Sequence, residues 1–186
     1  DWERILAIQT LSTTFRTLGF WSGHVNYQRW LTANDDRATR GGPMIERPSA
    51  HVLNATVNSD VRRSIFGRAF VSMRRANYDA WQTTTSLSVG VQTSERWNLL
   101  VGPNLTRGLN SAQYVGTVAD DLAVETFGAW YLFAPLRQTT LSMDTRLNVT
   151  FSPRMSFQMF AQPFISSLDY RDRKSTRLNS SHSSVS

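Results

Sequence analysis

Within residues 1–171, the side chains best suited to acid–base chemistry are two histidines, His24 and His51, and the chain contains no cysteine. The absence of cysteine excludes a Cys–His nucleophile pair. A Ser–His–Asp arrangement stays open, because its members meet in space and not in sequence. Neither histidine accompanies a nucleophile motif such as Gly-x-Ser-x-Gly. The sequence therefore predicts no catalytic residue and a chain that is not an enzyme.

Carboxylates gather in two polar segments, Asn34 to Pro43 and Asp120 to Glu125. Calcium takes about six to eight oxygen ligands at defined spacings, and neither segment follows the EF-hand pattern. Gly41, Gly42 and Pro43 are instead typical of a turn. The sequence also has no zinc spacing and no phosphate-binding loop. We expect solvated loops, without a metal or a cofactor site.

The segments that carry these side chains alternate between apolar and polar residues. From Leu141 to Phe151 the odd-numbered residues are mainly apolar and the even-numbered residues are polar, and the pattern resumes after the turn Ser152 to Arg154. A period of two is the signature of a β-strand with one apolar and one wet face. The alternation predicts eight long strands, over about residues 4–16, 21–28, 53–58, 65–74, 81–92, 97–106, 141–151 and 155–165.

The length of these strands and the spacing of their connections favour a membrane barrel. The segment from Leu141 to Phe151, tilted by about 40°, rises about 25 Å, the height of the apolar band of an outer-membrane barrel. Short turns near residues 17–19, 59–62, 94–96 and 152–154 alternate with longer loops at 33–49, 75–80 and about 108–138. The longest loop has extended segments of its own, so we expect it to form a hairpin above the membrane. The sequence thus predicts an all-β, antiparallel up-and-down outer-membrane β-barrel, present as a truncated fragment.

Charged and amide side chains occupy the polar face of several predicted strands. In a barrel they would line the lumen, because an arginine in contact with lipid costs about 2–4 kcal/mol at mid-membrane. The lumen-facing candidates are Arg68, Arg74, Asp144, Arg146 and Asn148. They could set the charge selectivity of a pore or form a structural ion-pair network that fills the interior, and we favour the network.

Aromatic residues gather at the ends of the predicted strands. Rings that combine an apolar body with a polar edge favour the boundary between membrane and water. We therefore expect an aromatic girdle formed by Trp21, Trp81, Trp97 and Phe151. Aromatic residues also favour strands in general, so strand formation alone is the alternative explanation.

Charge and composition narrow the range of partners. The net charge is +6, and the basic residues are dispersed along the strands, so nucleic-acid binding is disfavoured. The hydrophobic content is 40%, and no stretch approaches the roughly 20 apolar residues of a transmembrane helix. A barrel strand needs an apolar residue only at every second position. We expect outer-membrane lipid as the partner and the bacterial outer membrane as the location.

Several short blocks resemble a bacterial family. The blocks are Arg40–Pro43, Asn58–Asp60, Ala112–Val115, Gln138–Leu141, Asp144–Phe151 and Phe160–Phe164. Together they resemble the C-terminal part of the domain-of-unknown-function 5916 family, over about residues 20–170. The resemblance implies an outer-membrane β-barrel preceded by a domain similar to carbohydrate-binding modules. It implies binding or passage of carbohydrate-like ligands at the cell surface, and it supplies no catalytic residues.

The two ends of the chain depart from this family pattern. The sequence starts without a methionine or a signal segment, so we expect the start of the gene and the N-terminal domain to be missing. Residues Asp172 to His182 resemble one reading frame of a sequencing-adapter oligonucleotide, and the serine-rich end loses the alternation. We therefore expect a partial barrel over residues 1–171 and a non-native, disordered tail over residues 172–186.

Two other functions stay open on the sequence alone. A soluble β-sandwich module that binds a ligand would show the same alternation. Its apolar face would lie in a dry core between two sheets, and its strands would typically be shorter. A hydrolase embedded in a barrel would depend on His24 or His51.

Overall fold

The computed structural model describes residues 7–94 and 96–170, and most of them form β-strands. The main sheet consists of β1 (Ile8–Arg16), β2 (Ser22–Trp30), β5 (Ala50–Asn58), β6 (Ile65–Ala76), β7 (Trp81–Ser94), β8 (Trp97–Ala119), β9 (Ala129–Ser152), β10 (Met155–Ala161) and β11 (Phe164–Tyr170). A separate two-stranded sheet consists of β3 (Ala33–Asp35) and β4 (Ile45–Arg47), and one helical turn, η1, spans Val124–Thr126. The predicted tail lies outside the described residues.

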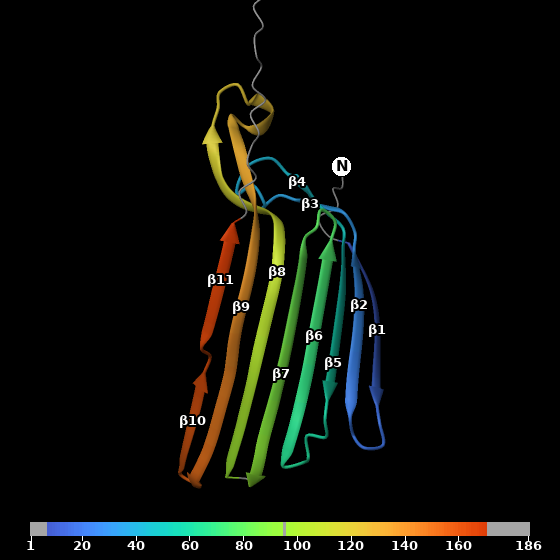
Figure 1. The fold of residues 1–186 in the computed structure, drawn as a ribbon, viewed down its shortest axis with the longest axis vertical. Helices are drawn as coiled ribbons and strands as arrows, with labels where there is room; N and C mark the ends of the chain where they lie inside the picture. The colour runs from blue at the N-terminus through green and yellow to red at the C-terminus, as the bar shows by residue number, and fades with distance from the viewer. Residues whose placement is uncertain (1–6, 95, 171–186) are drawn as a thin grey trace, which may run out of the picture.

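Each long strand pairs antiparallel with the next one along the chain, in the order β1-β2-β5-β6-β7-β8-β9 (Figure 1). Both β10 and β11 pair with β9 in one register, and between them the Met143 N–H donates to the Pro163 carbonyl oxygen at 3.0 Å. They therefore act as one strand interrupted near Pro163, and the sheet has eight up-and-down strands. This architecture confirms the all-β antiparallel prediction. The edges of the sheet are β1 on one side and β10 with β11 on the other.

The register keeps the alternation of the strands in phase, so that one face is mainly apolar and the other is mainly polar, with a few rings such as Phe66, Phe70 and Phe160 on the polar face. Even-numbered residues pair with even-numbered residues, as Arg68 does with Ser88, except beside two short turns and in the tip of the β8–β9 hairpin. All odd-numbered positions therefore share one face, the odd face, and all even-numbered positions share the even face. The odd face exposes large apolar side chains, including Leu87 (53% exposed) and Val89 (51%). The predicted alternation is confirmed.

Short turns lie at one end of the sheet and long connections lie at the other, as predicted. The β1–β2, β5–β6, β7–β8 and β9–β10 connections gather at the lower end of the sheet in Figure 1. The predicted bounds of the loop at 108–138 are wrong, because β8 and β9 stay paired as far as Ala119 and Ala129. The ladder tolerates two register shifts, after Asn110 and after Tyr114, so the predicted hairpin is a direct extension of the sheet.

The predicted polar loop at 33–49 contains the β3–β4 hairpin, which lies across the long-connection end of the sheet (Figure 1). The buried apolar residues of the described ranges are small and few: Ala33, Ala50, Val52, Ala80, Ala123 and Ala129. Within those ranges no second layer of strands covers the odd face. No helix in the described part of the chain has the length and apolar character needed to cross a bilayer.

Candidate functional site

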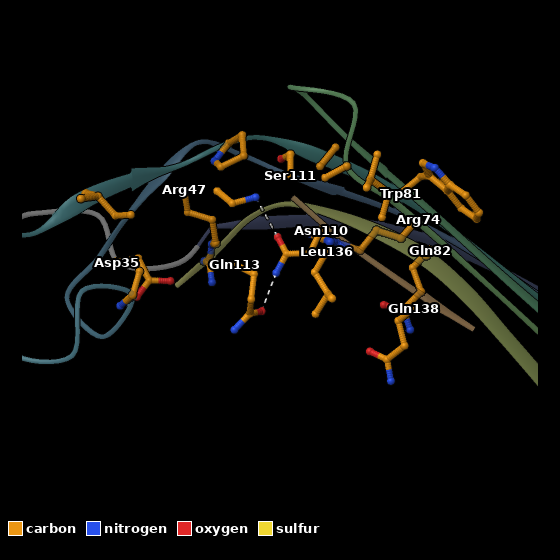
Figure 2. Close-up of a pocket in the computed structure, with 18 of the residues that line it drawn as sticks. Asp35, Arg47, Arg74, Trp81, Gln82, Asn110, Ser111, Gln113, Leu136 and Gln138 are labelled. Carbon is orange, nitrogen blue, oxygen red and sulfur yellow. Dashed lines mark hydrogen bonds between the residues drawn. The ribbon is translucent and has the colours of Figure 1, made fainter. Parts of the chain in front are cut away.

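A cavity of about 540 Å³ lies between the even face of the sheet and residues 33–49, here called the covering loop (Figure 2). The covering loop contributes Asp35 and Arg47 to its wall. The sheet contributes Arg74 from β6, Gln82 from β7 and Gln138 from β9. These sheet residues have even numbers, so the register places them on the same face, one row from the long connections.

The covering loop is held in shape by its own polar side chains. Thr39 is 1% exposed, and its Oγ1 donates to the Pro43 carbonyl oxygen at 2.9 Å. One carboxylate oxygen of Asp35 accepts the N–H groups of Arg37 at 3.0 Å and Ala38 at 3.1 Å. Such bonds from Asp to the next backbone amides fix a tight turn. One oxygen of this carboxylate therefore stabilises the backbone of the covering loop.

The covering loop also packs against the β8–β9 hairpin. The guanidinium carbon of Arg40 lies 4.9 Å from the centroid of the Tyr114 ring. The Tyr131 ring lies so close to Gly42 that an added Cβ would overlap it. Gly41 has a φ of +102°, in the region that favours glycine. The Gly-Gly-Pro turn predicted from the sequence is thus shaped by close approach to a second hairpin.

Two arginines flank one tryptophan at the edge of the cavity. The guanidinium carbons of Arg74 and Arg47 lie 5.6 Å and 6.0 Å from the centroid of the Trp30 ring. The Trp30 Nε1–H donates to the Gln28 Oε1 at 2.9 Å, which orients the indole. The Nε of Arg74 is buried without a hydrogen-bond partner among the described residues. A buried donor of this kind is usually satisfied, so the cavity wall offers a hydrogen bond.

Amide side chains make up much of the remaining polar wall. The Asn110 Nδ2 donates to the Gln113 Oε1 at 3.0 Å, and the Asn110 Oδ1 accepts the Ala112 N–H at 3.2 Å, both drawn in Figure 2. Gln82 and Gln138 also line the cavity. Amides both donate and accept hydrogen bonds, which suits a ligand rich in hydroxyl groups.

The five predicted lumen residues share the even face, but only one of them lines the cavity. Arg74 does so, whereas Arg68, Asp144, Arg146 and Asn148 lie nearer the short turns. The favoured ion-pair network is wrong, because none of the four charged side chains forms an ion pair within the described ranges. Arg146 lies over the Phe160 ring at 5.2 Å, and the Asp144 Oδ1 is buried without a partner there. Arg68 and Arg74 lie on β6, and the strands β7 and β8 separate them from Asp144. Asp144 and Arg146 are neighbours on the same face of β9, but their side chains form no ion pair among the described residues.

Neutral hydrogen bonds link the even face in place of ion pairs. They join polar side chains of neighbouring strands: Asn54 with Asn26 at 3.5 Å, Thr84 with Thr106 at 3.1 Å, Ser86 with Asn104 at 2.7 Å, and Thr140 with Ser166 at 3.0 Å. Each pair is a register partner, so the strand ladder itself aligns the hydroxyl and amide groups. Period-two alternation signals this polar surface, but the sequence does not say which residues pair.

The four predicted girdle residues all lie on the odd face. Trp21, Trp97 and Phe151 lie at the short-turn end, and Trp81 begins β7 at the long-connection end. Trp21 and Phe151 are exposed, whereas Trp81 and Trp97 are half-buried. Their positions at the two ends of the sheet are as predicted, and the girdle at a membrane boundary stays a prediction.

The two histidines lie on opposite faces of the sheet. The Nδ1 of His24 lies 3.1 Å from the Thr14 hydroxyl on the even face. On the odd face, the Nδ1 of His51 lies 2.6 Å from the Tyr27 hydroxyl, and the two rings stack. The Tyr27–His51 pair escaped the sequence analysis, because it arises from the β2–β5 register. No group of three or more possible metal-ligating side chains occurs among the described residues.

Comparison of the chain with family models, with curated proteins and with solved structures finds no match. The family resemblance noted in the sequence therefore stays a prediction. The function of the site is therefore inferred from the geometry of the sheet and its cavity.

Proposed function

We propose that this chain forms part of the wall of an outer-membrane β-barrel, with its odd face toward lipid and its even face toward the lumen. The observation that carries the proposal is the contrast between the faces. The odd face exposes large apolar side chains and has no charged residue between the short turns and the row that contains Arg107. The even face carries Arg68, Asp144 and Arg146 at mid-strand, where a water-filled lumen would keep them hydrated.

The lengths of the strands support the same proposal. The two longest strands, β8 and β9, span 23 and 24 residues, far above the usual length of about five or six in globular proteins. Their odd positions carry no charge from Trp97 to Leu105 in β8 and from Thr139 to Phe151 in β9, which rise about 20 Å and about 30 Å at a tilt of about 40°, close to the roughly 25 Å of a membrane band. A soluble sandwich would need a second apolar surface over Leu87 and Val89, which are about half exposed here.

For the ligand, we propose a carbohydrate-like molecule that binds in the cavity under the covering loop or passes beside it. The ligand class comes from the family resemblance. The cavity supports it with the amides of Gln82 and Gln138 and with the buried Nε of Arg74, which a ligand oxygen would satisfy. The position of the cavity beside the long connections suits a ligand that arrives from outside the cell.

The membrane part is tested with two tryptophans at the same height on opposite faces. Trp81 belongs to the odd face and Trp30 to the even face. Variants that keep one of these tryptophans and carry phenylalanine at the other tryptophan positions are refolded into vesicles that contain brominated phospholipid. We expect strong quenching of Trp81 fluorescence and weak quenching of Trp30. Equal quenching would contradict the assignment of the faces, and no quenching of either residue would contradict the membrane wall.

The ligand part is tested by calorimetry on the micelle-bound chain, with malto- and cello-oligosaccharides as probes. The variant Gln82→Ala/Gln138→Ala removes two cavity amides, and we expect about tenfold weaker binding, because each lost hydrogen bond contributes about 0.5–1.5 kcal/mol. The control Asn148→Ala lies on the same face outside the cavity and should bind as the parent does. Equal binding by both variants, or no binding by the parent, would contradict the cavity as a carbohydrate site.

A further inference from the structure

Four arginines of the main strands lie on the odd face, at or one row below the height at which β2 and β6 end and β5 and β7 begin. This arginine belt consists of Arg29, Arg75, Arg107 and Arg137. Cross-strand pairing sets three of them in one row, because His51 faces both Arg29 and Arg75, Trp81 faces both Arg75 and Leu109, and Leu109 faces Arg137. Arg107 lies in the next row toward the short turns, where it faces Thr83 and Thr139.

The side chains of the arginine belt are exposed and unpaired. None of the four forms a hydrogen bond or an ion pair among the described residues. Asp169 stands opposite Arg137 in the β9–β11 register, but the two side chains form no ion pair. From the belt to the short turns, the odd positions of the strands carry no charge. The belt therefore forms a mainly basic row, with Asp169 beside Arg137 at its β11 end, and the apolar surface between this row and the short turns carries no charge.

Aromatic side chains accompany the belt at the same height. Tyr27 and His51 are joined at 2.6 Å on the odd face, and Trp81 lies in the row that contains Arg75. Rings with a polar edge favour the level of lipid headgroups. Basic side chains, aromatic rings and the start of the apolar band thus coincide across strands β2 to β9, as a flat bilayer surface requires.

We propose that the arginine belt binds the phosphate groups of acidic membrane lipids at the long-connection edge of the bilayer. The proposal rests on the membrane wall proposed above. A guanidinium group presents a planar fork of N–H donors that matches phosphate oxygens in a bidentate manner. Basic residues near an acidic lipid surface are attracted to it over about a Debye length. Arginines that were only solvated surface residues would be expected to be scattered over the sheet. These four instead lie together at the border of an apolar band, which is where lipid phosphate groups would lie.

The opposite end of the sheet offers a matched control. Arg63, Arg96 and Arg154 lie in short connections, and Arg16 lies on the even face at the end of β1, so none belongs to the odd face of a strand. All four are exposed. Their replacement by glutamine removes the same charge as replacement of the arginine belt, without touching the rim.

The test compares the parent chain, the belt variant (Arg29, Arg75, Arg107 and Arg137→Gln) and the control variant (Arg16, Arg63, Arg96 and Arg154→Gln). Each is partitioned between micelles and vesicles made of phosphatidylcholine alone or mixed with phosphatidylglycerol. For the parent we expect preferential binding to the acidic vesicles. We expect the belt variant to lose about tenfold or more of that preference, because four basic residues at the headgroup level are removed. The control variant should keep most of it.

The outcomes separate this proposal from the membrane wall on which it rests. If the parent enters both kinds of vesicle equally, or if the belt and control variants lose the preference equally, the lipid-phosphate site is wrong and the membrane wall stands. If the parent enters neither kind of vesicle, the membrane wall itself is wrong. A loss confined to the belt variant supports the phosphate site.

Discussion

The two faces of this sheet share every strand, yet they distribute charge in opposite ways. On the odd face, arginine appears at the rim and is absent from the middle of the strands. On the even face, Arg68, Asp144 and Arg146 lie at mid-strand without ion pairs among the described residues. Since the backbone is common to both faces, the difference reflects what surrounds each face. Unpaired charges are stable where water reaches them and costly where it does not.

The faces also differ in what packs on them. The covering loop folds over the even face and encloses a cavity there, whereas the odd face is left open. A surface that exposes this much apolar area in water would be an aggregation site or an interface. The membrane wall proposed above would account for the bare odd face, and a water-filled lumen would account for the charges on the even face. Substitutions on each face test this contrast.

The largest effect is expected from an arginine placed at the middle of the odd face. Leu87→Arg should lower the free energy of unfolding in lipid vesicles by about 2–4 kcal/mol, because the charge would face hydrocarbon. Ser88→Arg introduces the same side chain at the next residue, on the even face; repulsion from Arg68 opposite it adds at most about 1 kcal/mol, so the total cost should stay below that of Leu87→Arg. Urea unfolding followed by tryptophan fluorescence measures both changes. Similar costs for the two variants would contradict the proposal that one face meets lipid and the other meets water. A substitution on a water-exposed surface usually changes the free energy of unfolding by no more than about 0.5 kcal/mol.

A second change tests the covering of the even face. Gly42→Val would drive a branched side chain into the Tyr131 ring, and such overpacking typically costs about 1–3 kcal/mol. We expect the covering loop to move off the sheet and the cavity to open, which limited proteolysis within residues 33–49 would detect. Gly116→Val is the control, because a Cβ at Gly116 meets nothing within 4 Å. Partial rescue of Gly42→Val by Tyr131→Ala would assign the effect to this contact.

Period-two alternation was sufficient to predict the strands, the two faces and the ends at which short and long connections lie. Where the alternation stops, the sequence gives no sign that two strands stay paired. It therefore did not predict that the β8–β9 ladder continues past Asn110. The favoured ion-pair network failed for a related reason. Arg68 and Asp144 share the even face, but β7 and β8 separate them in the sheet. The contact between Gly42 and Tyr131 depends on long-range folding that no local pattern encodes.

A third change concerns the charges outside the two faces, at the short-turn end. The Asp60 carboxylate accepts two hydrogen bonds of 2.9 Å from the Arg62 guanidinium, and this contact lowers its pKa from 3.8 to about 2. Because the folded pKa lies below the unfolded one, the stabilisation is present above pH about 4 and is lost as the pH falls through about 2. Arg62 also lies over the Phe20 ring at 3.4 Å, so the pair ties two neighbouring turns together.

As the pH falls from about 4 to about 2, protonation of Asp60 should lower the free energy of unfolding. We expect Asp60→Asn to abolish this contribution, as measured by urea unfolding in micelles. Arg62→Met should act in the same direction, and the double variant should add little to either single variant. Arg63→Met is the control, because its guanidinium affects the Asp60 carboxylate only weakly and through space. An unchanged pH slope in Asp60→Asn would show that the turn contributes nothing to acid sensitivity.

The smallest effect is expected at two adjacent threonines, where substitution by valine should change the free energy of unfolding in opposite directions. Thr84 lies on the even face, where its hydroxyl lies 3.1 Å from the Thr106 hydroxyl, whereas Thr85 lies exposed on the odd face and makes no side-chain hydrogen bond among the described residues. Thr84→Val should destabilise the chain by about 0.5–1.5 kcal/mol, because it leaves Thr106 without its partner. Thr85→Val should stabilise it by up to about 1 kcal/mol in vesicles, because a methyl group replaces a hydroxyl that faces hydrocarbon. If both substitutions change the free energy of unfolding in the same direction, the odd face does not meet hydrocarbon and the proposed difference between the faces is wrong.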